Sequence, residues 1–219
     1  MRSFIFAAAF AIAAISGGAA SADTIEVVSG QQRSFQLAAF GPTGQSFVAI
    51  DSDLTSFGFQ FNALNPSFAN LPFTFTLREG VGFGGAVVST VDFTLPLSIN
   101  SRTPTWFDFD VTGTKVTVGD TYTAILSSSS GRNGVVMGPA INLSTGQEVT
   151  GDAYLPGRAF FTTPVYPNCA ITGNCDLNFR VTGVTPTGAV PEPASWALMI
   201  GGVGLAGGAL RRRRTIAFA

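Results

Sequence analysis

Phenylalanines at every second position constrain the fold of this chain more than any other sequence feature. Phe57, Phe59 and Phe61 alternate with small or polar residues, and Phe73 and Phe75 repeat the pattern. Successive side chains of an extended strand point to opposite faces, so this period gives each strand one apolar face. The phenylalanines therefore predict strands that cover a core. A hydrophobic binding groove is the alternative use of the same face.

The rest of the chain's middle part predicts further short strands, because no window there shows a helical repeat and glycine and proline interrupt it at short intervals. Many short strands with regular turns are typical of a sandwich or barrel. We predict an all-β fold, a jelly-roll-like β-sandwich of about eight to ten strands. The candidate strands cover residues 24–28, 34–37, 46–50, 56–64, 73–77, 86–93, 106–111, 116–118, 121–126, 135–137, 158–162 and 177–182. The glycine-rich run 79–85 predicts a hairpin rather than a phosphate-binding loop.

Residues 1–22 have the pattern of a secretory signal peptide. Met1-Arg2 is basic, residues 4–15 form a short apolar stretch, and Ala20-Ser21-Ala22 is a small-residue cleavage site. Such a segment is removed on export and takes no part in the fold. An uncleaved N-terminal anchor is the alternative.

The C-terminal segment 191–214 predicts a single transmembrane helix. An uncharged apolar run of 17 residues, 194–210, ends in four consecutive arginines. This length is at the short limit of what crosses a bilayer core, and the arginines predict a cytoplasmic end. We expect a linker at 185–190 before the helix and a cytoplasmic tail at 215–219. A buried core helix is the alternative.

The same segment resembles the PEP-CTERM sorting signal of Gram-negative bacteria, in its PEPxxWA variant. The matching residues are Pro191, Glu192, Pro193, Trp196, Ala197, Gly201, Gly204, Arg211, Arg212, Arg213 and Arg214. The resemblance implies recognition by an exosortase-type membrane transpeptidase that cleaves near Pro-Glu-Pro. It also implies export, anchoring in the inner membrane, and then transfer to the cell surface or extracellular matrix of a Gram-negative bacterium.

Removing both ends leaves an exported domain at 23–184, which is one domain by length. It keeps seven basic and twelve acidic side chains, a net charge of about −5. Such a surface has no electrostatic footprint for nucleic acid or anionic lipid, so we expect no nucleic-acid partner.

Cys169 and Cys175 are the only cysteines, and they lie six positions apart in the exported domain. An even pair of cysteines in an exported chain predicts a disulfide that closes a small loop. A metal site is the alternative, although two thiols without histidine do not complete a zinc site.

The chain has no histidine, which removes Ser–His–Asp and Cys–His catalysis. Carboxylate pairs are the remaining route to catalysis, and Asp51 with Asp53 or Asp108 with Asp110 each lie on one side of an extended segment. Glycoside hydrolases use two carboxyl groups across a sugar, but acids this close in sequence are ordinarily solvated. We therefore predict no catalytic residue.

Calcium is the one cofactor that the sequence suggests. Asp51, Asp53 and Asp152 lie in oxygen-rich loop segments, and aspartate side chains with backbone carbonyls are typical calcium ligands. Ordinary turn acids are the alternative.

Binding of a glycan is the function that the remaining aromatic and amide residues favour, because aromatic faces stack on sugar rings and amides hold hydroxyl groups. The candidate contacts are Trp106, Tyr154, Tyr166, Arg132 and Asn133.

The body also resembles a recurrent exported β-sandwich that precedes PEP-CTERM tails. The similar segments are 45–47, 121–124, 153–157 and 176–181, and the resemblance implies no activity. We expect a non-enzymatic, cell-surface-sorted protein associated with extracellular polysaccharide or envelope matrix. The alternatives are a carboxylate-dependent glycoside hydrolase or lyase and a purely structural coat protein.

Overall fold

The computed structural model describes residues 21–29, 33–63, 72–96, 103–128, 133–139, 145, 147, 150–162, 175–186, 199–205 and 207. The chain divides into two units, of which one is the body, Ser21–Pro186, and the other comprises Met1–Ala20 and Thr187–Ala219. In the second unit, residues 199–205, which include Gly201 and Gly204, are helical and exposed. Among the described residues, no helix is both long enough and apolar enough to cross a membrane.

Several predicted features lie outside the described residues. They are most of the signal peptide and most of the predicted transmembrane segment, including Pro191, Glu192, Pro193, Trp196, Ala197 and Arg211–Arg214.

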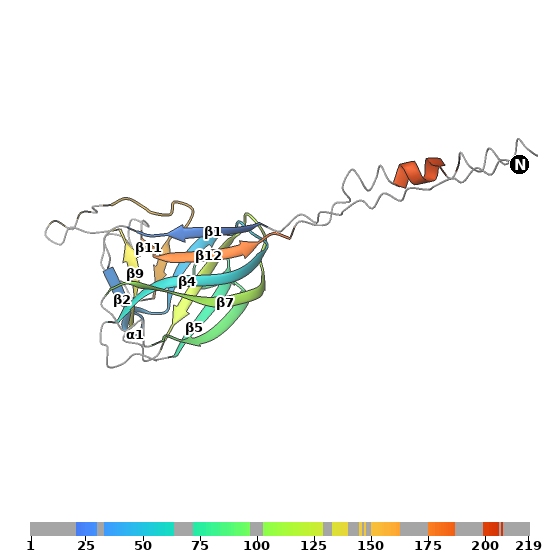
Figure 1. Ribbon diagram of the computed structural model, residues 1–219. Coiled ribbons are helices and arrows are strands. Elements are labelled where there is room, and N and C mark those ends of the chain that lie inside the picture. Colours follow the sequence, from blue (N-terminus) through green and yellow to red (C-terminus); the bar gives the residue numbers. More distant parts are fainter. Residues whose placement is uncertain are drawn as a thin grey trace, which may run out of the picture. The chain divides into compact units, whose positions relative to one another are not determined.

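The body consists almost entirely of antiparallel strands (Figure 1). Its described part has twelve strands and one short helix, more strands than the eight to ten predicted. The elements are β1 (Ala22–Val27), β2 (Arg33–Gln36), α1 (Leu37–Phe40), β3 (Thr43–Val48), β4 (Asp53–Ala63), β5 (Pro72–Glu79), β6 (Val87–Thr94), β7 (Thr105–Lys115), β8 (Thr121–Ser127), β9 (Asn133–Gly138), β10 (Ala159–Phe161), β11 (Asp176–Leu177) and β12 (Phe179–Val184).

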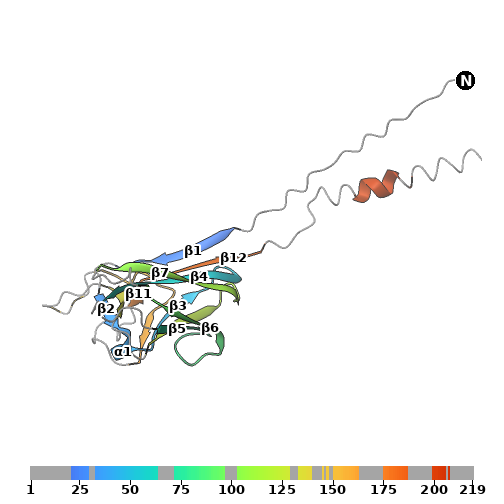
Figure 2. The ribbon, with the colours of Figure 1, turned by 60° about the horizontal axis from the view of Figure 1, so that its bottom comes forward.

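The strands form two sheets, visible in Figures 1 and 2. We call the seven-stranded sheet the outer sheet; its order is β1-β12-β4-β9-β11, with β2 paired to β9 and β7 paired to β4. We call the five-stranded sheet the inner sheet; its order is β10-β3-β8-β5-β6. Phe59 of β4 pairs with Phe107 of β7 and with Phe179 of β12, so β7 and β12 lie on opposite edges of β4. The pairs β2–β9, β3–β8, β4–β7 and β5–β6 are nested in the sequence, each inside the one before.

The core lies between the two sheets and is built from phenylalanine rings. Phe57, Phe59 and Phe61 of β4 are all 0% exposed, which confirms that this stripe faces the core. The ring of Phe57 lies 5.2 Å from that of Phe75 on the inner sheet. The ring of Phe61 lies 5.8 Å from that of Phe73. The two stripes found in the sequence therefore face each other across the sandwich.

Two predicted strands differ from the structure. The segment 116–118 is not a strand. The backbone N–H of Val116 donates to the carbonyl of Ser52, and the chain then turns where the N–H of Asp120 donates to the carbonyl of Thr117, with Gly119 at a φ of 89°. The predicted strand 177–182 is interrupted at Asn178, whose side chain is 0% exposed. Its backbone N–H donates to Val136 and its carbonyl accepts from Gln60, so Asn178 bridges β9 and β4 where β11 gives way to β12.

The strand ends define two ends of the sandwich. Ala22, where β1 begins, pairs with Val184, where β12 ends, so both connections to the rest of the chain leave from one place. We call this the exit end. The β5–β6 connection is a hairpin, as the sequence predicts, because Arg78 pairs with Val87. It turns at the exit end, where the backbone N–H of Gly80 donates to the carbonyl of Thr121 at the start of β8. The opposite end, where β6 finishes at Thr94, is the distal end.

Truncation of Phe57, whose ring lies among rings of both sheets, should lower the stability of the body strongly. We expect Phe57→Ala to lower the free energy of unfolding by about 3–5 kcal/mol, because it leaves a cavity among rings from both sheets. Val81→Ala, at a side chain that is 60% exposed, is the control and should change it by less than about 0.5 kcal/mol. Urea unfolding measures both, and equal values for the two variants would contradict this account of the core.

Candidate functional site

A row of charged groups crosses the solvent-facing side of the outer sheet. Strand register aligns Glu26 of β1 with Arg180 of β12, Arg180 with Gly58 of β4, and Gly58 with Asp108 of β7. Each of these residues lies next in sequence to residues that point into the core, so period two turns all four toward solvent. We call these four residues the outer row.

Arg180 is the centre of the outer row. Its Nε donates to Asp108 Oδ1 at 2.6 Å, and its Nη2 donates to Asp108 Oδ2. Its Nη1 lies 3.5 Å from Glu26 Oε2. The hydrogen bonds to Asp108 raise the pKa of Arg180, so the guanidinium stays charged. A bidentate pair of this kind fixes the plane of the guanidinium group.

Trp106 extends the row, because it is two residues from Asp108 on the same side of β7. The guanidinium carbon of Arg180 lies 4.6 Å from the centre of the Trp106 ring. Gln60, the partner of Trp106 in the β4–β7 register, is held from behind by Asn178, whose Nδ2 donates to Gln60 Oε1 at 2.8 Å. Trp106 therefore lies beside a hydrogen-bonded part of the sheet, and the Arg180 guanidinium stacks on one face of its indole.

Gly58 allows the charged side chains to meet above β4. A Cβ atom at this position would lie 2.1 Å from Asp108 Oδ1 and 3.2 Å from Arg180 Cγ. Any larger residue would push Asp108 and Arg180 apart, so the glycine keeps the row closed.

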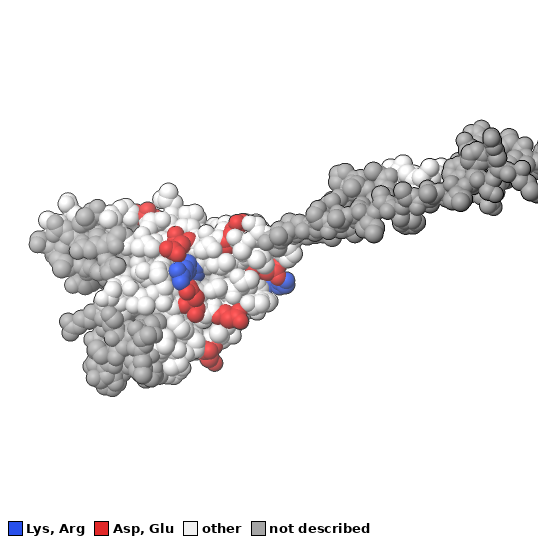
Figure 3. All heavy atoms as spheres, viewed as in Figure 1, with Lys and Arg blue, Asp and Glu red and all other residues white. Residues whose placement is uncertain are grey.

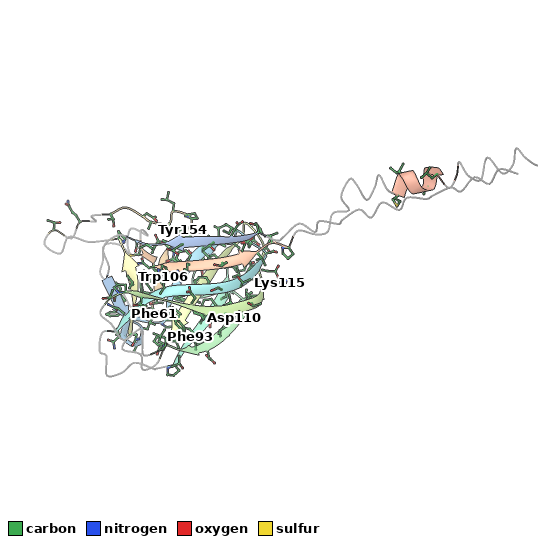
Figure 4. All side chains as sticks on the ribbon, viewed as in Figure 1. Phe61, Phe93, Trp106, Asp110, Lys115 and Tyr154 are labelled. Atoms are coloured by element: carbon green, nitrogen blue, oxygen red, sulfur yellow. The ribbon has the colours of Figure 1, made fainter. Side chains whose placement is uncertain are left out.

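The charge of this face limits what it can bind. Figure 3 shows basic atoms between two groups of acidic atoms, with further acidic groups on the same face and uncharged surface over most of the rest. The outer row carries two carboxylates and one guanidinium, and Asp110 adds another exposed carboxylate beyond it. Figure 4 shows Asp110 and Trp106 on this face. A polyanion would be repelled, whereas a neutral ligand with many hydroxyl groups could donate to the carboxylates.

Asp108 and Asp110, one of the two carboxylate pairs considered for catalysis, have structural partners. Both oxygens of Asp108 accept from Arg180. Asp110 Oδ1 accepts from the backbone N–H of Thr112 at 2.7 Å, and hydrogen bonds from Thr112 lower the pKa of Asp110. A carboxyl group with a lowered pKa is a poor proton donor near neutral pH.

The other predicted contact residues are placed differently. Asn133 is 2% exposed. Tyr154 is half-buried: its hydroxyl accepts from the backbone N–H of Val48 at 3.1 Å, and its ring lies 5.4 Å from that of Phe179. Arg132 and Tyr166 lie outside the described residues. Three of the five predicted contacts are described, and of these three Trp106 belongs to the polar cluster on the outer face.

The prediction missed Arg180 and Glu26. Their alternation within strands was readable from the sequence, but the register that joins them to Asp108 was not. Arg180 and Asp108 are 72 residues apart.

Asp152 and Asp176 form a second carboxyl pair. The backbone N–H of Tyr154 donates to Asp152 Oδ1 and to Asp176 Oδ2, both at 2.9 Å. Asp176 is 1% exposed, and its Oδ1 accepts from Gln45 Nε2 at 2.8 Å. Burial raises the pKa of Asp176 to about 7, and the neighbouring Asp152 adds to the rise. The pair holds the 151–158 loop against β3 and β11.

The three calcium candidates divide between two places. Asp152 belongs to the pair with Asp176, whereas Asp51 and Asp53 flank Ser52 where β4 begins. Asp51 is 2% exposed, and its Oδ1 accepts from Thr185 Oγ1 at 2.9 Å. Asp53 pairs with Lys115. In the described part of the chain, no three His, Cys, Asp or Glu side chains gather as a metal site would require.

Two further features bear on ligand sites. Cys175 is disulfide-bonded, and its predicted partner Cys169 lies outside the described residues. A cavity of about 450 Å³ opens beside α1, and it is lined by Leu37, Ala38, Gly41, Pro42, Pro72, Thr74, Ser127 and Ser128. It is separate from the outer row and contains no charged side chain among these residues.

Comparison with known proteins identifies the C-terminal segment. Residues 189–214 match the PEP-CTERM protein-sorting motif, so the chain carries this signal. The motif implies export, recognition by an exosortase and sorting to the cell surface. No curated protein matches the chain in sequence.

Two of the solved structures that are similar to this chain have the following identity and coverage. One is the structure of the infectious bursal disease virus Gx strain, with 16% identity, a TM-score of 0.34, and coverage of 80% of this chain and 35% of that chain. The other is the clostridial cysteine protease Cwp84 after propeptide cleavage, with 6% identity, a TM-score of 0.44, and coverage of 75% and 40%. The chain thus spans well under half the length of either structure.

The buried carboxyl pair predicts a pH dependence of stability. The pKa of Asp176 is raised from 3.8 to about 7 in the folded body, so the folded state holds this proton more tightly than the unfolded chain. The resulting stabilisation is complete below pH 3.8 and is lost as the pH rises through about 7. Denaturant unfolding between these limits should show this fall.

Asp176→Asn should remove the fall, whereas Asp120→Asn, at an exposed turn residue, should retain it. A fall of the same size in Asp176→Asn would show that another group titrates.

Proposed function

We propose that the exported body is a non-enzymatic module that binds neutral polysaccharide of the extracellular matrix through the outer row and Trp106. The observation that carries the proposal is the stack of Arg180 on Trp106, with the guanidinium held by Asp108 on one side and Glu26 on the other. A planar ring beside fixed hydrogen-bonding groups suits a sugar, which has apolar C–H faces and hydroxyl edges.

Charge supports a neutral glycan over an acidic one. The outer row has one more carboxylate than guanidinium, and all three donor nitrogens of Arg180 that face the row already have carboxylate partners. A uronic acid or sulfate group would find no free cation there. A neutral sugar avoids this repulsion, and its hydroxyl groups can donate to the spare lone pairs of Asp108 and Glu26.

Weak binding at one face is compatible with a surface role. A single stacked aromatic contributes about 1 kcal/mol, so each body would bind weakly. Many copies on one cell surface contacting one long polymer would gain affinity through multivalency.

The remaining parts of the proposal concern topology and placement. A jelly-roll arrangement is supported by the nested pairs β2–β9, β3–β8, β4–β7 and β5–β6. We propose that residues 1–22 direct secretion and that 194–210 anchor the precursor in the inner membrane before sorting. A Cys169–Cys175 disulfide would stabilise the last loop. We keep calcium binding by Asp51, Asp53 or Asp152 as a proposal, although the described residues include no group of three ligating side chains.

Loss of the indole should weaken glycan binding. We expect Trp106→Ala to reduce affinity for a neutral polysaccharide about fivefold, equivalent to roughly 1 kcal/mol, and Trp106→Phe to retain most of it. Leu155→Ala, at a side chain that is 85% exposed, is the matched surface control. Affinity electrophoresis in gels that contain neutral or acidic polysaccharide measures these effects.

Retention that is unchanged in Trp106→Ala would contradict this site. No retention of the unsubstituted chain on any matrix polymer would contradict binding altogether and favour a purely structural coat protein.

Sorting should remove the basic end of the chain. Mass spectrometry of the protein from the cell surface should show a mature form that begins near Asp23 and lacks Arg211–Arg214, because an exosortase would cleave near Pro191. Replacement of Pro191, Glu192 and Pro193 by alanine should leave the full tail attached and the protein in the inner membrane. Surface protein that still carries Arg211–Arg214 would contradict transpeptidase sorting.

A further inference from the structure

Exposed apolar side chains of the body gather at the exit end. The described body has six large apolar side chains that are strongly exposed, and four of them lie at this end. They are Ile50 at 43%, Val81 at 60%, Val87 at 53% and Val118 at 51% exposure, whereas Val28 and Leu155 lie elsewhere in the sequence. Scattered apolar side chains are normal on a soluble surface, but a gathered set marks an interaction site.

Backbone hydrogen bonds hold two of these side chains next to each other. Ala49 donates to the carbonyl of Asp120 at 2.9 Å, and Gly119 donates to the carbonyl of Ala49 at 2.8 Å. Ile50 follows Ala49, and Val118 precedes Gly119. The β3–β4 loop and the β7–β8 turn therefore present both side chains from one joined surface.

The β5–β6 hairpin is joined to the same surface. Gly80 donates to the carbonyl of Thr121 at 2.8 Å, and Val81 is the next residue. Val87 begins β6 on the other arm of this hairpin. The exposed apolar side chains, which we call the apolar tips, come from the β3–β4 loop, the β7–β8 turn and the β5–β6 hairpin. Backbone hydrogen bonds fix these three connections at one end of the sandwich.

The length of the connecting segment limits how far the exit end can lie from the membrane in the anchored precursor. The body ends at Pro186, and the apolar run begins at Ala194. Eight residue steps span at most about 28 Å when fully extended. The exit end of an anchored body therefore stays within this distance of the bilayer.

We propose that the exit end docks on the lipid surface of the membrane in the anchored precursor, with Ile50, Val81 and Val118 in the headgroup region. This inference rests on the proposed anchoring by the C-terminal segment. Three aliphatic side chains bind lipid weakly by themselves, but a short tether raises their effective concentration at the bilayer.

The charges at the exit end favour neutral lipid. Asp120 and Glu79 are exposed beside the apolar tips, and Lys115 is paired with Asp53. Anionic headgroups would be repelled by these two acids. The appropriate probe is therefore a vesicle of phosphatidylcholine.

A site-directed fluorescence experiment tests the docking. The full chain carries Val118→Cys labelled with a thiol-reactive fluorophore, and it is reconstituted in phosphatidylcholine vesicles that contain a headgroup-region nitroxide lipid. Thr94→Cys, at the exposed last residue of β6, is the distal-end control. Cys175 is already disulfide-bonded, and the unsubstituted chain measures any labelling of native cysteines.

We expect nitroxide quenching at Val118→Cys to exceed that at Thr94→Cys by about twofold or more, since docked side chains lie within the interface. Equal quenching in vesicles from which alkaline carbonate does not extract the chain would overturn the docking and leave the anchoring in place. Extraction of the chain by carbonate would overturn the anchoring and the docking together. Glycan retention of the same labelled proteins is measured separately and fails only if the proposed binding fails.

A charge substitution provides a second test. With the fluorophore at Ile50→Cys, the additional change Val118→Asp should lower quenching to the level of Thr94→Cys, because a carboxylate resists entry into the interface. Thr94→Asp is the matched control and should change nothing. Quenching that survives Val118→Asp would overturn the proposed contact.

Discussion

Contact between phenylalanine rings of the two sheets is the interaction on which the rest of the structure depends. Phe57 touches rings from four other strands: Phe47 of β3, Phe75 of β5, Phe109 of β7 and Phe179 of β12. These contacts fix β7 and β12 against β4 in one register. Since a shift of one residue would turn every ring to solvent, the core also determines which side chains meet outside. Arg180 meets Asp108 above Gly58 because the neighbouring rings meet below it.

The faces of the strands could be predicted from the sequence, but their partners could not. Period two in Phe57, Phe59 and Phe61 was enough to assign the core face, and Asp108 and Asp110, expected to be solvated, are exposed. Pairing between strands depends on long-range packing, so the contact of Arg180 with Asp108 had no local signal. The interruption at Asn178 was missed for the same reason, because its partners Ser29 and Gln60 are 149 and 118 residues away.

Polar residues were harder to assign than apolar ones. Tyr154 and Asn133 have the residue types of sugar contacts, yet Tyr154 is held by a hydrogen bond to Val48 and a ring contact with Phe179, and Asn133 is buried. Asp152 resembles a calcium ligand in sequence. In the structure, Asp152 and Asp176 both accept from the backbone N–H of Tyr154. A short polar side chain can satisfy the backbone or bind a ligand, and only its neighbours in space distinguish the two roles.

The sandwich separates the tasks of an exported surface protein. Its interior is filled by rings, its outer sheet carries the polar row, and both connections to the rest of the chain leave from the exit end. The strands of the body align these parts rigidly, so a glycan on the outer sheet and a membrane at the exit end would not compete for the same residues.

The most direct test of the central claim is an NMR titration of the full chain with short neutral oligosaccharides. The account predicts that the indole N–H resonance of Trp106 and the Nε–H resonance of Arg180 shift together as the sugar binds, while the side-chain amide of buried Asn178 stays unchanged. Saturable binding that leaves Trp106 and Arg180 unshifted would contradict the account, because the sugar would then occupy another part of the molecule.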